Sequence, residues 1–200
     1  MYDFAAAACR FRWVAVIVSA CVLASCSHVP VTSLLKLSQI DFVTTDPALM
    51  RAAVKLPRQL RPRPDGMRLH LVVKMNNGSE EAQDFALREV SDAADLLALR
   101  NELSSGSALF AYRIDPDDLA RLKAFRATML AKKNTGVKGS LTISVRPETC
   151  RTETLGEGPV LFSTYLRTSE TGSYVPLTRD VDLRSLDATR DIAALIPPCA

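Results

Sequence analysis

The stretch MRLHLVVKM, residues 67–75, decides the fold class, because its side chains alternate in character. Successive side chains of a β-strand point to opposite faces of the sheet. One face would carry only apolar side chains, from Met67, Leu69, Leu71, Val73 and Met75. The other face would carry Arg68, His70, Val72 and Lys74. This period of two predicts a strand with one face in the core.

Asn76-Asn77-Gly78 follows this strand directly. Asparagine and glycine accept the positive φ angles of tight turns, so the pattern predicts a hairpin with a return strand over residues 82–90. Similar runs predict further strands over residues 34–44, 108–114, 140–146, 160–167 and 174–181.

Helix signals lie between these strands. Asp115 and Pro116 are suited to the N-cap and first position of a helix, which Lys132, Lys133 and Gly136 would end. Ser91 could cap a helix over residues 92–103, and Asp46-Pro47 could begin a short helix that Pro57 ends. A last short helix is expected over residues 188–195.

These elements predict an α+β fold in one domain, with a mostly antiparallel sheet and two to four helices. The chain has 200 residues and is 48% hydrophobic, enough for one sizeable core. Its 25 basic and 22 acidic residues give a net charge of +3. A nucleic-acid partner is not expected, since such proteins carry a strong, clustered basic excess.

The N-terminus has the pattern of a secretory signal. Arg10 and Arg12 precede an apolar run over residues 13–23. This run is shorter than the roughly 20 residues that cross a bilayer as a helix. A buried core helix is the alternative, but it would need a polar face that the run lacks. A basic segment before a short apolar segment instead indicates a cleaved signal peptide.

Leu23-Ala24-Ser25-Cys26 resembles the lipobox of bacterial lipoproteins. The resemblance covers the first 26 residues and implies that residues 1–25 are removed and that Cys26 carries the lipid. Two or three acyl chains anchor a protein stably, at about 0.8 kcal/mol per buried CH₂. Ser27 stands where Asp would resemble an inner-membrane retention signal, so the resemblance favours the outer membrane, with the domain facing the periplasm.

Residues 26–33 would then form a tether, and residues 34–200 the globular domain. Cys9 and Cys21 belong to the signal, and Cys26 is used by the lipid. Cys150 and Cys199 remain, and an oxidising periplasm favours a disulfide between them. Two unpaired buried thiols are the alternative.

Residues 55–68 form the one clear compositional shift, with five basic residues and three prolines. The basic residues are Lys55, Arg58, Arg61, Arg63 and Arg68. They could contact anionic head groups, each adding about 1 kcal/mol near such a surface. We favour the alternative, an exposed proline-stiffened loop, because the charges are too widely spaced for a dense cluster.

No catalytic residue, metal site or cofactor is predicted. His28 lies in the tether, and His70 shares its strand face with Arg68 and Lys74, so we expect it to point to solvent. The sequence has neither a Gly-x-Ser-x-Gly elbow nor a glycine-rich phosphate loop. The carboxylates of residues 115–118 fit helix capping better than a calcium loop, which needs later ligands and a glycine.

The sequence therefore predicts a non-enzymatic envelope lipoprotein whose domain binds or supports another envelope component. Its sheet edges could accept a partner strand. The first alternative is an adaptor subunit of an envelope transport or assembly machine. The second is a hydrolase of an envelope polymer that uses paired carboxylates. The expected partners are the membrane, through Cys26, and an envelope protein.

Overall fold

The computed structural model describes residues 31–41, 44–186 and 191–199. It contains a seven-stranded sheet of order β5-β2-β3-β4-β1-β6-β7, in which all neighbours are antiparallel. The strands are β1 (Arg51–Pro57), β2 (Leu60–Met75), β3 (Glu80–Val90), β4 (Ser107–Ile114), β5 (Gly139–Arg151), β6 (Leu161–Arg167) and β7 (Val175–Asp182). The prediction of one domain with a mostly antiparallel sheet and helices is confirmed.

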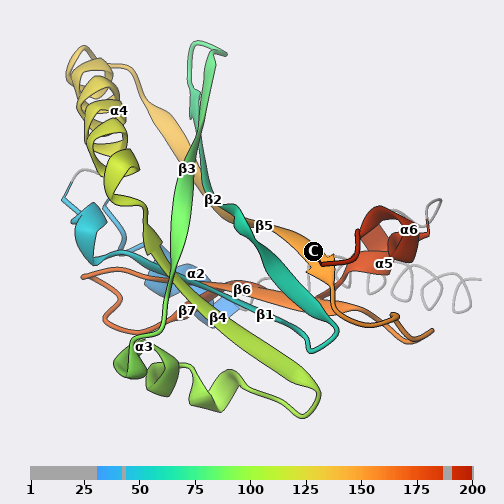
Figure 1. The fold of residues 1–200 in the computed structure, drawn as a ribbon. Coiled ribbons are helices and arrows are strands. Elements are labelled where there is room, and N and C mark those ends of the chain that lie inside the picture. Colours follow the sequence, from blue (N-terminus) through green and yellow to red (C-terminus); the bar gives the residue numbers. More distant parts are fainter. Residues whose placement is uncertain (1–30, 42–43, 187–190, 200) are drawn as a thin grey trace, which may run out of the picture.

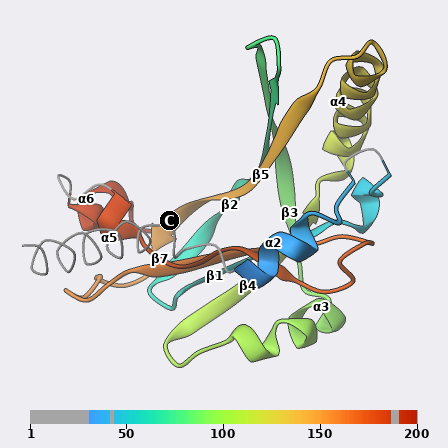
Figure 2. The ribbon, with the colours of Figure 1, turned by 180° about the vertical axis from the view of Figure 1, so that it is seen from behind.

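The helices are short, with one exception. The α-helices are α2 (Val31–Leu37), α3 (Ala93–Ala98), α4 (Pro116–Asn134), α5 (Leu183–Leu186) and α6 (Ile192–Leu195). Two 3₁₀ turns, η2 (Pro47–Leu49) and η3 (Arg100–Glu102), complete the order. Figures 1 and 2 show α4 beside the ends of β2, β3 and β5 that lie far from β6 and β7.

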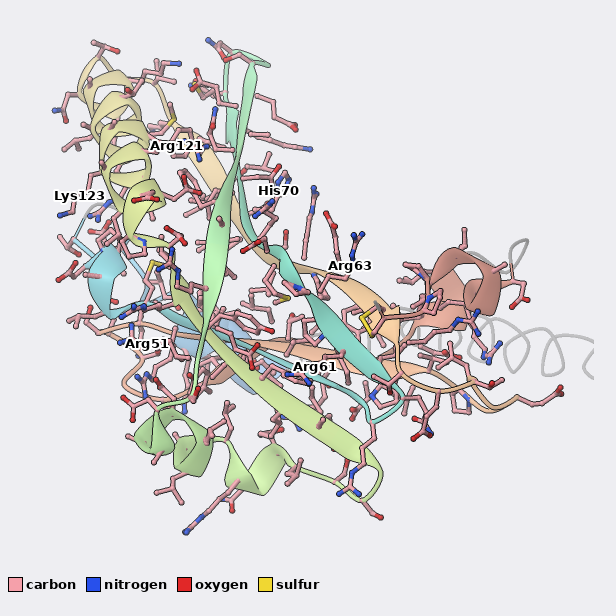
Figure 3. All side chains as sticks on the ribbon, viewed as in Figure 1. Arg51, Arg61, Arg63, His70, Arg121 and Lys123 are labelled. Carbon is pink, nitrogen blue, oxygen red and sulfur yellow. A yellow bond between two sulfur atoms is a disulfide. The ribbon has the colours of Figure 1, made fainter. Side chains whose placement is uncertain are left out.

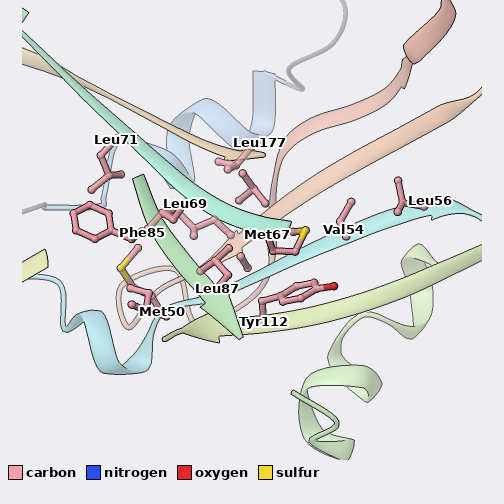
Figure 4. Close-up of a cluster of buried hydrophobic side chains, with 14 of the residues drawn as sticks. Met50, Val54, Leu56, Met67, Leu69, Leu71, Phe85, Leu87, Tyr112 and Leu177 are labelled. Carbon is pink, nitrogen blue, oxygen red and sulfur yellow. The ribbon is translucent and has the colours of Figure 1, made fainter. Parts of the chain in front are cut away.

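The hairpin of β2 and β3 confirms the alternation in residues 67–75. Met67, Leu69 and Leu71 are at most 1% exposed, and Leu69 lies opposite the buried Phe85 of β3. The turn has Gly78 at a φ of 84°, the left-handed region that glycine adopts readily. Figure 4 shows how these side chains meet those of β1 and β4 in the main core.

Strand β1 corrects the predicted helix before Pro57. Asp46 does cap a helical turn, since its carboxylate accepts a hydrogen bond from the Ala48 N–H at 3.0 Å, but the turn is only η2. The chain then enters β1, which pairs with β4 and β6 and is buried over residues 52–56. A strand buried on both faces has no period-two pattern, so the sequence could not distinguish it from a helix.

The predicted loop over residues 55–68 is also wrong, because most of it lies in β1 and β2. Pro62 is tolerated there because this part of β2 pairs with β5 on one side, whereas its pairing with β3 begins only at Arg68. A bulge then follows, with Asp65 at a φ of 57°. A Cβ at Gly66 would lie 2.9 Å from the Cβ of Glu148, so this close approach requires glycine.

Other boundaries differ at both ends of the chain. The predicted strand over residues 34–44 is wrong, because α2 begins at Val31, inside the predicted tether. The predicted last helix corresponds to α6, with α5 before it, and residues 187–190 lie outside the described residues. Helix α3 begins after Asp92, which caps it in place of Ser91.

Helix α4 confirms the strongest helix prediction. Asp115 is its N-cap and accepts a hydrogen bond from the Asp117 N–H at 3.0 Å. Its buried apolar stripe consists of Leu122, Phe125 and Met129, and the Phe125 ring lies 6.2 Å from that of Phe85 in β3. This contact joins α4 to the β2–β3 hairpin and positions the groove described next.

Candidate functional site

A groove of about 590 Å³ lies between the C-terminal half of α4 and the beginning of β5. Its size lies within the range of ligand pockets, roughly 300–1,000 Å³. Its apolar lining consists of Val73 and Met75 from β2, Met129 and Leu130 from α4, and Val137 and Leu141. The groove could therefore accept apolar groups of a ligand or partner.

The end of α4 forms one wall because the chain reverses there. The N–H groups of Gly136 and Val137 donate to the carbonyls of Lys133 and Lys132, at 3.0 and 3.2 Å. Gly136 has a φ of 88°, the left-handed conformation that commonly ends helices. The chain can thus enter β5 beside the helix it has just left.

Four basic side chains and one acidic side chain, that of Asp41, line the groove. Arg126 donates to the Thr45 carbonyl at 2.6 Å, and Lys132 pairs with Glu81. Lys133 and Lys138 are exposed, and neither forms an ion pair within residues 31–41, 44–186 and 191–199. The mouth therefore carries two cations that an anionic group could neutralise.

The groove borders the outer edge of β5, which ends the sheet. The Asn76 N–H donates to the Lys138 carbonyl at 2.8 Å, so the backbone groups of Lys138 point towards β2. Since these directions alternate along an antiparallel strand, those of Gly139, Leu141, Ile143 and Val145 point outward. In the described part of the chain, no group outside the sheet ladder hydrogen-bonds to them.

Other edges are better protected against strand addition. Strand β4 pairs with β3 only over residues 87–90, so the preceding part of β3 has one free edge. Helix α4 contacts this edge: Asp118 accepts from the Ala86 N–H at 2.6 Å, and Arg121 donates to the Asp84 carbonyl at 3.0 Å. Figure 3 shows Arg121 on the side of α4 that faces β3, and Lys123 on the other side. Strand β7 contains Pro176 and an irregular register, and α2 packs against it. Prolines and bulges are common protections of edge strands.

A second polar cluster lies under α3. The Asp95 carboxylate, 2% exposed as a residue, pairs with Arg51 at 3.3 Å and Arg167 at 2.7 Å. It also accepts from the Tyr174 hydroxyl at 3.1 Å. Burial and the nearby Asp95 charge raise the pKa of Tyr174 above its usual range. The Asp95 carboxylate is fully occupied by these partners, so we assign the cluster a structural role. No local sequence signal could have revealed it, because its residues lie far apart in the chain.

A third cluster contains Lys55, Asp180 and Ser163. The Lys55 ammonium lies 3.0 Å from the Asp180 carboxylate, which also accepts from the Ser163 hydroxyl at 3.2 Å. Although Ser163 shares a cross-strand pair with Lys55, it is 0% exposed. A substrate could not reach its hydroxyl in this arrangement.

The predicted disulfide is confirmed, because Cys150 and Cys199 are bonded. Cys26, the predicted lipidation site, lies outside the described residues. The prediction that His70 points to solvent needs correction. Its side chain is only 12% exposed, and its Nδ1 lies 2.8 Å from Asp84, its cross-strand neighbour.

The structure does not bring the five basic residues of segment 55–68 together. Lys55 is buried and paired, so it is no surface cation, which corrects that part of the prediction. Arg58 and Arg61 are exposed, and Arg63 lies 3.8 Å from Glu148. Arg68 is half-buried beside β5. Contact of these arginines with an anionic surface stays a prediction.

No family model, no curated protein and no solved structure matches the chain significantly. Among the described residues, no three His, Cys, Asp or Glu side chains are grouped so that they could hold a metal ion. None of the helices in this part of the chain is long and apolar enough to span a membrane.

Proposed function

We propose that the protein is a bacterial envelope lipoprotein, anchored through a lipid on Cys26, whose domain is a non-enzymatic binding module. The groove between α4 and β5 is its binding site. The observation that carries this proposal is the combination of an apolar lining with the cations of Lys133 and Lys138, for which the described residues supply no ion-pair partner. Apolar pockets with a few charged groups at their rim are typical binding sites.

The anchor rests on the sequence pattern before Cys26. In this proposal the signal over residues 1–25 is removed and Cys26 begins the mature chain. Helix α2 begins at Val31, five positions later. At roughly 3.3–3.6 Å per residue, the folded domain would start within about 18 Å of the lipid-bearing residue. The anchor would therefore hold the folded domain close to the membrane surface.

A Cys26→Ser substitution tests the anchor. Wild type should float with the outer-membrane fraction on a density gradient and incorporate labelled fatty acid. The variant should do neither, although its domain is unchanged. Membrane flotation of the variant at the mature size would contradict the proposal.

Site-specific photocrosslinking tests the groove. A photoreactive residue at Leu130, which lines the groove, should crosslink to a discrete envelope component in intact cells. The same residue at Thr128, exposed elsewhere on α4, is the matched control. Equal crosslinking from both positions would contradict a binding role for the groove, and hydrolysis of peptidoglycan or lipid by the purified domain would contradict a non-enzymatic role.

The adaptor function is the second candidate, and the uncovered edge of β5 favours it. An edge with free backbone groups suits a protein partner, because an extended segment can extend the sheet. Pull-down of the lipidated protein should then recover one partner in fixed stoichiometry. Recovery of lipid without a protein partner would be consistent with a binding module and would contradict the adaptor function.

A further inference from the structure

We propose that the outer edge of β5 binds an extended segment of a partner protein as an additional strand. The partner strand alternates apolar and polar side chains and carries acidic residues at both ends. This inference rests on the proposed binding function and names the chemistry of the partner. Three features of β5 support it: its backbone, its two faces and its charges.

The backbone provides the affinity. Gly139, Leu141, Ile143 and Val145 direct their N–H and C=O groups outward, by the alternation that Asn76 and Lys138 establish. This row of donors and acceptors contains no proline, since Pro147 lies beyond it. A partner strand of about eight residues could pair along it.

The chain itself already uses this edge at its far end. The Arg151 N–H donates to the Pro197 carbonyl at 2.9 Å, and the Cys199 N–H donates to the Arg151 carbonyl at 2.9 Å. The tail thus forms a parallel bridge between Pro198 and Arg151. The outer edge of β5 therefore accepts extended chain, and the bridge stops before the row from Gly139 to Val145.

The two faces of β5 define the side-chain pattern of the partner. Leu141, Ile143 and Val145 pack towards the core, and Leu141 lines the groove with Met129. A partner side chain on this face would meet apolar surface. The opposite face carries Ser140 and Thr142, both exposed, so the alternate partner side chains would be polar. This is the pattern of an amphipathic strand.

The charges define the ends of the partner. Arg146 lies directly opposite Arg68 in the pairing of β5 with β2, and like charges in such positions are destabilising. Neither arginine forms an ion pair within the described residues, and Lys138 at the other end of the row is also unpaired. An acidic residue at each end of the partner strand would neutralise these cations.

Amide hydrogen exchange by NMR on residues 26–200 tests the pairing. The probe is a synthetic peptide of about eight residues that alternates valine and threonine between acidic ends. Without peptide, the amides of residues 139, 141, 143 and 145 should exchange fast, and those of residues 140, 142 and 144 slowly. The peptide should slow the first group at least tenfold and leave the second unchanged. The same peptide with N-methyl groups on its pairing amides should slow the exchange of none of these amides.

Two variants of the protein sharpen the test. Ile143→Pro removes an outward N–H without removing a bond to β2, so a folded variant should lose at least tenfold in peptide affinity. Arg146→Glu should lower the affinity for the peptide with acidic ends and raise the affinity for a peptide with lysine at its ends. If Ile143→Pro fails to fold, the charge reversal and the N-methylated peptide still decide the question.

Three results would overturn the inference. The first is slow exchange of all four outward amides without peptide, because the edge would then be covered. The second is no binding of the peptide at millimolar concentration. The third is binding of a lysophospholipid in the groove, with shifts of Met129 and Leu141 and no protection of the amides by peptide. This third result would leave the groove as a binding site and so preserve the proposed function.

Discussion

Cys150 and Cys199 join the C-terminal tail to the outer edge of β5, with their Cα atoms 4.9 Å apart. The backbone hydrogen bonds of Arg151 to Pro197 and Cys199 lie beside the disulfide. Together they cover this end of the edge strand, whereas no described residue outside the sheet hydrogen-bonds to the outward backbone groups from Gly139 to Val145. The cross-link therefore contributes to stability and also limits where a partner can pair.

Removal of the disulfide should destabilise the domain. The bond links residues 49 positions apart. Constraining a loop of this length in the unfolded chain contributes about 4 kcal/mol, less any strain. The double substitution Cys150→Ser with Cys199→Ser should lower the free energy of unfolding by up to this amount in urea titrations. Reduced wild type is the control and should match the variant; an unchanged midpoint would contradict the expectation.

Asp118→Ala should destabilise the contact between α4 and β3. The Asp118 carboxylate accepts from the Ala86 N–H at 2.6 Å and pairs with Arg121. The substitution leaves that N–H without its acceptor, which costs about 1–3 kcal/mol. Asp117→Ala is the control, since its side chain is exposed in the same turn. Equal unfolding free energies for the two variants would show that the link to β3 is unimportant.

Substitution of Asp180 should lower the free energy of unfolding more than substitution of Lys55. The Lys55 side chain is 11% exposed, whereas that of Asp180 is 48% exposed. Asp180→Asn leaves a buried ammonium without its partner, which should cost about 1–2 kcal/mol after allowance for solvent screening. Lys55→Met leaves the Asp180 carboxylate without its partner but partly in water, so it should lower the free energy of unfolding by less. Asparagine also tolerates the φ of 49° at this position, so backbone strain does not confuse the comparison. Chemical denaturation that gives the reverse order would contradict this account.

The stability gap between wild type and Asp180→Asn should narrow in acid. Partial burial opposes ionisation of Asp180, but the hydrogen bond and charge of Lys55 outweigh it and lower the pKa of the carboxyl group. Because the folded-state pKa is the lower one, the stabilisation is complete above the unfolded value, about 3.9. It is lost as the pH falls through the folded value. Urea titrations between pH 7 and 2 test this, and a gap independent of pH would contradict it.

The tyrosines of the domain should ionise only when it unfolds. Burial raises the pKa of Tyr112, Tyr165 and Tyr174 above 10, with further contributions from Glu89, Glu102 and Asp95 respectively. The neutral hydroxyl is favoured in the folded state, so this stabilisation is present below the unfolded pKa of about 10 and is lost as the pH rises.

Ultraviolet absorbance of tyrosinate, measured with circular dichroism on residues 26–200, tests this expectation. The other tyrosine of the chain, Tyr2, is absent from that segment. Both signals should change in one joint transition. A tyrosine that titrates near pH 10 in the folded domain would show that its hydroxyl is accessible.

The hairpin, the long helix and the disulfide could be predicted because their signals are local or compartmental. Residues 67–75 alternate strictly, and Asp115-Pro116 is a strong helix start. The pairing of Cys150 with Cys199 was predicted because the lipobox resemblance assigns the other three cysteines to a signal and a lipid, and because an oxidising compartment favours disulfides. For the hairpin and the helix, a short stretch of sequence was sufficient.

Strand β1 shows what local patterns could not reveal. It is the sheet neighbour of β4 and β6, and its middle residues are buried on both faces. Its apolar run therefore lacks the period of two that identified β2. The sequence favours a loop for the basic segment after β1 for a related reason. Prolines are acceptable in that part of β2 only because β3 does not pair with it.

The sequence by itself determined the α+β class, the main hairpin, the capped helix and, through the lipobox resemblance, the pairing of Cys150 with Cys199. Only the tertiary structure decided that α4 and β5 form a groove, that Lys55 is buried, and that no described residue outside the sheet pairs with the outer edge of β5 between Gly139 and Val145. Local side-chain patterns report which face of an element avoids water. They do not predict which distant elements come into contact, because these contacts depend on the register and curvature of the whole sheet.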